Sequence, residues 1–149
     1  MIYVTRRSQF SAAHRLFNPS FSADRNDMVF DKCNNIHGHN YTLDVTVKGL
    51  PDPETGYVID LKILRDIIEA EIIEKVDHKN LNVDVEFLDG LIPTAEHLAV
   101  TAWRILEKKI PAGALHCVKL FESENNFVEY RGEPVTLHRF HTQQFAEKA

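Results

Sequence analysis

Residues 37–47 read HGHNYTLDVTV and alternate with a period of two. One side of this stretch carries two histidines, a tyrosine and three aliphatic residues, and the other side carries small and polar residues. Such alternation is typical of a strand with one buried face. The stretch Ile2 to His14 has a similar pattern, with Ile2, Val4, Phe10, Ala12 and His14 on one side. We therefore expect two strands that each bury one face.

Two helices are predicted after the second strand. The segment LPDPETG (50–56) is rich in proline and glycine and forms a turn. Asp60 is a suitable N-cap for a helix that runs to about Val76, because apolar residues then recur on one stripe. A second helix is expected to start at Thr94 and to end near residues 111–113.

The end of the chain contains three strand-like runs, Leu115 to Ser123, Phe127 to Arg131, and Val135 to His141. By contrast, Phe17 to Asn34 is polar without a clean period, and a loop of this length is usually functional or disordered. The order strand, strand, helix, helix, strand, strand, with room for one more strand, predicts the α+β class. We expect an antiparallel sheet of four or five strands with the helices on one face. Its open edges favour closure by oligomerisation.

The composition predicts one globular domain over residues 1–149, with 44% hydrophobic and 26% charged residues. No apolar run approaches the roughly 18 residues of a membrane span, and the start lacks the apolar stretch of a secretory signal. Seventeen basic and 22 acidic residues give a net charge of −5, which argues against a general nucleic-acid surface. With only two cysteines, we expect free thiols and a cytoplasmic location.

Three histidines are candidates for one metal site. His37 and His39 project from the same face of a strand, and the glycine between them allows close approach, so the pair suits two imidazole ligands of one Zn²⁺. The alternative is a pair of histidines with ordinary hydrogen bonds, although an unpaired ring on an apolar face is costly. His14 would join them if the two strands pair, and three imidazoles without a thiolate are typical of catalytic zinc. We assign structural or surface roles to His97, His116, His138 and His141.

Cys33 is a candidate base. It stands between Lys32 and Asn34, a polar and cationic setting that favours the thiolate. Near a metal-bound substrate this thiolate could accept a proton, whereas as a metal ligand it would close the site. Cys117, inside a strand-like run, fits a small buried hydrophobe.

Two acidic positions are further candidates. The carboxylate of Asp77 beside His78 can form an acid–base relay, or the pair can simply end a helix, where a cation complements the helix dipole. Strand alternation directs Glu122 toward the core, where a buried carboxylate needs a partner. That partner is either the guanidine-like edge of a ligand, or Arg131 or Arg139.

Together these motifs resemble the family of 6-pyruvoyl-tetrahydropterin synthase and 6-carboxy-tetrahydropterin synthase. The matching segments cover nearly the whole chain and are FSAAHRL (10–16), CNNIHGHNY (33–41), TGYVIDLKIL (55–64), DHKNLN (77–82), PTAEHLA (93–99) and FESENNFVEY (121–130). The resemblance implies the tunnelling fold, in which trimers close a barrel and two trimers stack into a hexamer. It also implies active sites at the subunit interfaces.

The resemblance further implies 7,8-dihydroneopterin triphosphate as the substrate and a role for each motif. The implied zinc ligands are His14, His37 and His39, the base is Cys33, and the relay from a neighbouring subunit is Asp77 with His78. Glu122 would anchor the aminopyrimidine edge of the pterin, beside Pro93, Thr94, Ala95 and Glu96. The cations that flank these motifs, and that we expect near the phosphates, are Arg15, Lys32 and Lys79.

Two branches of this family differ in product. One forms 6-pyruvoyl-tetrahydropterin on the way to biopterin, and the other forms 6-carboxy-tetrahydropterin with loss of acetaldehyde, on the way to queuosine. The carboxy branch typically has three residues between the cysteine and His-Gly-His, and the pyruvoyl branch five. Three residues separate Cys33 from His37, which favours the carboxy branch, while the long preceding loop and ESENNFVEY look closer to the pyruvoyl enzymes.

Two other classes of function are open at this point. A zinc hydrolase, in which metal-bound hydroxide attacks the substrate, would not need Cys33. A non-enzymatic pterin- or metal-binding module would bind its ligand without releasing triphosphate.

Overall fold

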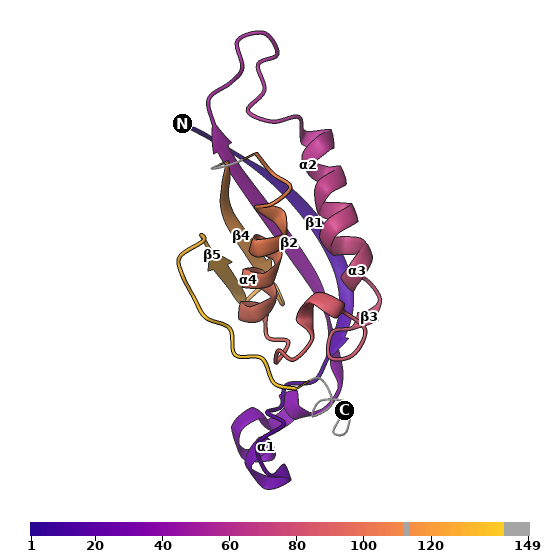
Figure 1. The fold of residues 1–149 in the computed structure, drawn as a ribbon. Helices are drawn as coiled ribbons and strands as arrows, with labels where there is room; N and C mark the ends of the chain where they lie inside the picture. The colour runs from indigo at the N-terminus through magenta and orange to yellow at the C-terminus, as the bar shows by residue number, and fades with distance from the viewer. Residues whose placement is uncertain (112–113, 142–149) are drawn as a thin grey trace.

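The computed structural model describes residues 1–111 and 114–141. Its centre is an antiparallel pair of long strands, β1 (Ile2–His14) and β2 (His37–Gly49), as the alternating patterns predict. β4 (Leu115–Phe121) pairs antiparallel with β2 on its other side, and β5 (Phe127–Tyr130) pairs with β4 (Figure 1). The predicted strands of the core sheet are therefore confirmed.

The fifth strand is not the one that the sequence suggested. β3 (Lys79–Asn80) adds two residues to the free edge of β1 and runs parallel to it, which makes the sheet mixed, in the order β3-β1-β2-β4-β5. The preceding helical rod runs alongside β1 in the same direction, so the chain that follows enters the sheet parallel (Figure 1). Residues 135–141 form no strand, and the prediction of one there is wrong.

The first helical rod runs from α2 (Leu61–Ile68) through a π-helical segment (Glu69–Ile73) into α3 (Glu74–Val76). It starts where predicted, because the side chain of Asp60 accepts a hydrogen bond from the Lys62 amide at 2.8 Å. The predicted end at about Val76 is also confirmed.

The second long helix, α4 (Ala95–Leu106), starts one residue after the predicted start at Thr94. Thr94 is its N-cap, and the Thr94 hydroxyl accepts a hydrogen bond from the His97 amide at 3.2 Å. It ends at Leu106, before the predicted end near residues 111–113, of which 112 and 113 lie outside the described residues. Among the described residues, no helix has both the length and the apolar character to cross a membrane.

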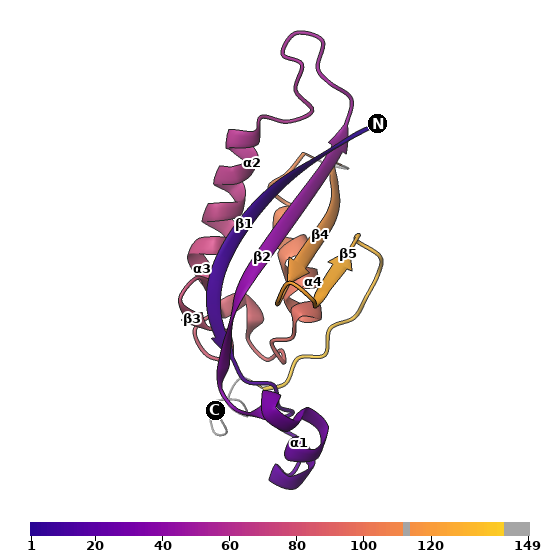
Figure 2. The same cartoon turned by 180° about the vertical axis from the view of Figure 1, so that it is seen from behind.

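The helices cover one face of the sheet, and within residues 1–111 and 114–141 no helix lies on the other face (Figure 2). On β1 and β2 the side chains that alternate toward the helices are mostly buried, which gives one hydrophobic core between the two layers. Its fully buried side chains include Tyr41, Leu43, Val45, Leu64, Ile68, Leu106, Val118 and Leu120.

The polar stretch from Phe17 to Asn34 is ordered and partly helical. It contains α1 (Ala23–Phe30) and a 3-10 turn (Asp31–Asn34), which together extend beyond the end of the β1–β2 pair (Figure 1). Ser22 caps α1 by accepting a hydrogen bond from the amide of Arg25 at 3.1 Å. The chain then returns to the sheet, and Cys33 in the 3-10 turn lies four residues before the start of β2 at His37.

Gly132, directly after β5, gives a prediction about stability. Its φ is 87°, and a Cβ there would overlap the ring of Trp103. We expect Gly132→Ala to lower the free energy of unfolding by about 2 to 4 kcal/mol, from the unfavourable φ and the overlap together. Gly56→Ala is the matched control, because Gly56 has a φ of 77° but open space around it, and should cost about 1 kcal/mol. Equal losses in urea unfolding would contradict the role of the Trp103 contact.

Candidate metal centre and active site

Three imidazole rings meet at one end of the β1–β2 pair. The strand register sets His14 directly opposite His37, and His39 lies two residues further along the same face. The ring centroids lie 4.6 to 5.0 Å apart, and one ligand nitrogen from each ring lies within 4.8 Å of the others. The three histidines therefore form a group that could hold one metal ion.

Backbone carbonyls set the orientation of two of these rings. Nδ1 of His14 lies 2.8 Å from the carbonyl oxygen of Pro93, and Nδ1 of His37 lies 2.7 Å from that of Asn35. A carbonyl can only accept, so each Nδ1 carries the proton and each Nε2 keeps a free lone pair. Partners of this kind fix the tautomer of histidines that bind metals.

The free nitrogen of His14 is buried without a partner. The residue has no exposed surface, and its Nε2 has no hydrogen-bond partner. An unpaired polar atom in the interior is costly, and a metal ion would supply the missing interaction. The three nitrogen donors suit a borderline metal such as zinc, so the residues present fit the group that the sequence predicted.

The protonation state of the rings agrees with metal binding. Burial lowers the pKa of His14 to about 4, and burial also lowers the pKa of His39 below its usual value. His14 is therefore neutral at pH 7, and a neutral imidazole binds a cation through its lone pair.

Glu122 extends this centre toward a cavity. Its Oε1 lies 3.2 Å from Nε2 of His39, while the alternative partners, Arg131 and Arg139, are engaged with Glu129 and with backbone carbonyls. The cavity has about 400 Å³ and lies between the start of α4 and the β4–β5 turn. Its lining includes Ala95, Glu96, Glu122, Asn125, Asn126 and Phe127.

Three of the five residues predicted to lie at the pterin line this cavity, namely Glu122, Ala95 and Glu96. The hydroxyl of Thr94 instead caps α4. The Glu122 carboxylate thus lies both at this cavity and against His39 of the histidine group.

Cys33 lies in the 3-10 turn just before the histidines of β2. Its carbonyl accepts a hydrogen bond from the amide of Leu16 at 2.8 Å, so the turn is fastened two residues after His14. The thiol is exposed, and Cys33 does not belong to the group of clustered metal donors. Cys117 is buried, as expected for a structural residue.

A hydrogen-bond network that the sequence did not reveal holds this turn in place. Nε of Arg15 donates to the carbonyl of Asn34 at 2.5 Å, and the Asn34 amide donates to Asp27 at 2.6 Å. The backbone amide of Arg15 donates to Oδ1 of Asn82 at 2.7 Å, and Nδ2 of Asn82 donates to the Arg15 carbonyl at 2.8 Å. In the sequence, the only sign of this network is that Arg15, Asn34 and Asn82 each belong to one of the matching motifs. One nitrogen of Arg15 is thus used inside the protein, although we had expected this residue near the phosphates.

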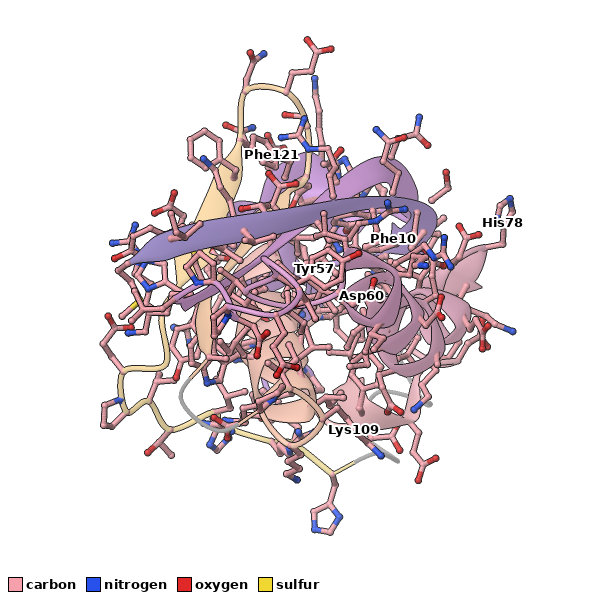
Figure 3. All side chains as sticks on the ribbon, turned by 90° about the horizontal axis from the view of Figure 1, so that it is seen from above. Phe10, Tyr57, Asp60, His78, Lys109 and Phe121 are labelled. Atoms are coloured by element: carbon pink, nitrogen blue, oxygen red, sulfur yellow. The ribbon has the colours of Figure 1, made fainter. Side chains whose placement is uncertain are left out.

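Asp77 and His78 contact one another and do not belong to the three-histidine group. Oδ1 of Asp77 accepts from the Ser11 amide at 2.9 Å and lies 3.0 Å from Nδ1 of His78. The bond from Ser11 lowers the pKa of Asp77. The His78 side chain is 83% exposed and projects away from the body of the chain (Figure 3). It lines a cavity of about 600 Å³ at the β3 edge, and Gly38 and His39 of β2 also line that cavity. Neither Asp77 nor His78 belongs to the group of clustered metal donors.

The geometry agrees with what comparisons with known proteins show. The sequence model described as 6-pyruvoyl tetrahydropterin synthase matches residues 3–133. The 6-pyruvoyl tetrahydrobiopterin synthase of Homo sapiens is 46% identical over 132 residues, which cover 87% of this chain and 91% of that protein. The chain belongs to the 6-pyruvoyl tetrahydropterin synthase family. It is therefore an enzyme, a lyase of the pterin-synthase type, as the motifs predicted.

A solved structure of the 6-pyruvoyl tetrahydropterin synthase family confirms the tunnelling fold. The Caenorhabditis elegans enzyme of that name superposes with a TM-score of 0.83 at 36% identity, covering 89% of this chain and 96% of that one.

A relative from the other branch is less similar to this chain. The 6-carboxy-5,6,7,8-tetrahydropterin synthase of Rickettsia bellii is 29% identical over 147 residues, 87% of this chain and 99% of that protein. The comparisons thus favour the pyruvoyl branch, contrary to the preference drawn from the spacing of Cys33 and His37.

Proposed function

We propose that this protein is a zinc-dependent 6-pyruvoyl-tetrahydropterin synthase that eliminates triphosphate from 7,8-dihydroneopterin triphosphate. The observation that carries the proposal is the grouping of three imidazoles whose ligand nitrogens lie within 4.8 Å of one another, with the buried Nε2 of His14 lacking a hydrogen-bond partner. The higher identity to pyruvoyl synthases than to a carboxy synthase supports the choice of product.

The residues of the chain divide the chemistry between them. A zinc ion held by His14, His37 and His39 would acidify the side-chain hydroxyls and adjacent C–H bonds of the substrate. The Cys33 thiolate takes a proton from the side chain, and triphosphate departs from the neighbouring carbon with its bonding electrons. The reaction rearranges the substrate internally, so no external oxidant or reductant is needed. Glu122 holds the aminopyrimidine edge, which fixes the distance between Cys33 and the reacting carbon.

The turn structure explains why the spacing before His37 is a weak guide to product. Cys33 is positioned by the bond from Leu16 to its carbonyl and by the Arg15–Asn34 contact, so the whole 17–36 excursion sets its reach. A count of the residues between Cys33 and His37 describes only the last part of that path. Sequence identity over the whole site therefore carries more weight.

Assembly supplies the relay in this proposal. Asp77 and His78 lie at the β3 edge and point outward, so they would serve the site of a neighbouring subunit. The short β3 and β5 edges and the uncovered face of the sheet support closure of a barrel and a hexamer of two trimers. Arg15, Lys32 and Lys79 would meet the triphosphate across such interfaces. A cytoplasmic location with Cys33 as a free thiol goes with this function.

The test is to incubate the purified, zinc-loaded protein with 7,8-dihydroneopterin triphosphate and to analyse the products. We expect triphosphate and 6-pyruvoyl-tetrahydropterin, and loss of both after chelation of the metal. Acetaldehyde with 6-carboxy-tetrahydropterin would assign the chain to the other branch. Tight pterin binding without triphosphate release would indicate a non-enzymatic module.

Glu122 gives a prediction about substrate affinity. A hydrogen bond to a charged group contributes about 1.5 to 3 kcal/mol, so we expect Glu122→Gln to raise KM for the pterin about 10- to 100-fold. Glu124→Gln, two residues along in the exposed turn, is the control and should leave KM unchanged. Zinc content is measured in parallel, because Glu122 also lies against His39. An unchanged KM for Glu122→Gln would exclude it as the pterin anchor.

A further inference from the structure

The chain continues beyond the region that matches the family. The match ends at residue 133, and residues 134–141, which we call the strap, run past α4 as an extended segment (Figure 1). Arg104 on α4 donates to the carbonyl of Val135 at 2.5 Å, and Leu137 packs against the core. The strap is therefore docked along its length, although it belongs to no sheet.

The far end of the strap is bonded to the loop before α4. The amide of Phe140 donates to the carbonyl of Gly90 at 2.7 Å, and the two nitrogens of the Arg139 fork donate to the carbonyls of Asp89 (2.5 Å) and Phe87 (3.4 Å). Gly90 has a φ of 78°, and a Cβ there would overlap the Phe140 carbonyl. Three carbonyls within four consecutive residues are thus held by the strap, and the two backbones are in direct contact.

The same loop supplies parts of the active site a few residues later. The Pro93 carbonyl accepts from Nδ1 of His14, and Thr94 caps the helix whose first residues line the cavity beside Glu122. Nδ1 of His97 lies 2.6 Å from the Ile92 carbonyl, which anchors the other end of the loop to α4. The strap holds residues 87–90 and His97 holds Ile92, so the chain that leads into Pro93 is fixed directly before it.

We propose that Arg139 is a positioning residue, which holds the 87–93 loop so that the Pro93 carbonyl orients His14 for the metal. The inference rests on the proposed function for its metal but not for its substrate. Loss of a direct hydrogen-bond partner of a metal ligand costs 10- to 100-fold in metal affinity. Arg139 acts on the metal ligand only through the loop, so we expect its substitution to lower metal affinity by the smaller factor in that range, about 10-fold.

The experiment compares two arginines in the whole chain. Arg104 on α4 donates to a backbone carbonyl of the strap, and Arg139 on the strap donates to backbone carbonyls of the loop. Arg139→Ala removes two of the three hydrogen bonds between the strap and the loop and leaves the one from the Phe140 amide. Arg104→Ala removes only the bond to Val135, away from the loop. Zinc affinity is measured by competition with a chromophoric chelator, well below the unfolding temperature. We expect about 10-fold weaker zinc binding for Arg139→Ala and an unchanged affinity for Arg104→Ala. Arg139→Lys, whose single ammonium cannot span both carbonyls, should fall between Arg139→Ala and the unmodified protein.

The outcomes separate a positioning role from a merely structural one. Equal zinc affinity in all variants, or an equal loss in Arg104→Ala and Arg139→Ala, would overturn the proposal. If Arg139→Ala does not fold, Arg139→Lys decides, and unchanged zinc affinity in that variant overturns it as well. The zinc measurement needs no pterin, so a failure of the unmodified protein to convert dihydroneopterin triphosphate would refute the proposed function and leave this comparison intact.

Discussion

Cys33→Ala should abolish nearly all turnover of 7,8-dihydroneopterin triphosphate while leaving the metal bound. A positioned base contributes about 100- to 10 000-fold to a proton-transfer step, so we expect kcat to fall by that factor. The thiol is exposed and lies outside the group of metal donors, so zinc content should match that of the unmodified protein. Steady-state kinetics with zinc analysis measures both quantities.

Cys117→Ala is the matched control for this substitution. Cys117 is buried in β4, where burial raises the pKa of its thiol, and it should affect stability without changing kcat. Retained turnover in Cys33→Ala would refute the elimination mechanism. It would support the rival class, a hydrolase whose metal-bound hydroxide needs no thiolate.

His37→Ala should remove the metal and, with it, the activity. The substitution deletes one of three ligands, so the loss of zinc affinity should exceed the 10- to 100-fold that follows when only a ligand's hydrogen-bond partner is removed. Because bound metal stabilises the folded state, the thermal midpoint in the presence of zinc should also fall. His37 is partly exposed at the end of β2, which makes it a milder change to the core than removal of the fully buried His14.

His116→Ala controls for loss of an imidazole. His116 lies on β4, its ring packs on Tyr3 with centroids 4.6 Å apart, and it does not belong to the three-histidine group. We expect unchanged zinc content in this variant. Full zinc occupancy in His37→Ala would mean that the three rings do not form the metal site.

The central strands and the grouping of His14 with His37 and His39 could be predicted because both depend on strand alternation. A period of two fixes which residues share a face, and antiparallel pairing of two long strands then sets His14 opposite His37. The same alternation directed Glu122 inward correctly, but its neighbour in the structure is His39 and not an arginine.

Elements without a buried apolar stripe could not be predicted. In α1 the one buried residue is Asn26, while Met28 is 84% exposed, so no hydrophobic period marks the helix. Its signal was the cap, Ser22 followed by Asp24 in the first turn. Residues 135–141 show the opposite error, since Val135 and Leu137 alternate like a strand, but the backbone there bonds to Arg104 and Gly90.

The two-residue β3 is too short for any pattern, and the position of His78, directly before this strand, could not be predicted for that reason. The choice between product branches could not be made locally either. Cys33 is held by contacts to residues 15 and 16, which a count of neighbours along the chain does not describe.

The π-helical segment at Glu69–Ile73 bears on how this chain is aligned with its relatives. Such a segment accommodates one extra residue within a helix, and every later residue is rotated by about a third of a turn. Asp77 lies four residues after this segment, directly behind the end of α3. When this chain is aligned with a homologue whose helix is uninterrupted, the homologue needs a gap of one residue within the π-helical segment. If the gap is placed in the turn after the helix instead, Asp77 is aligned with the wrong residue.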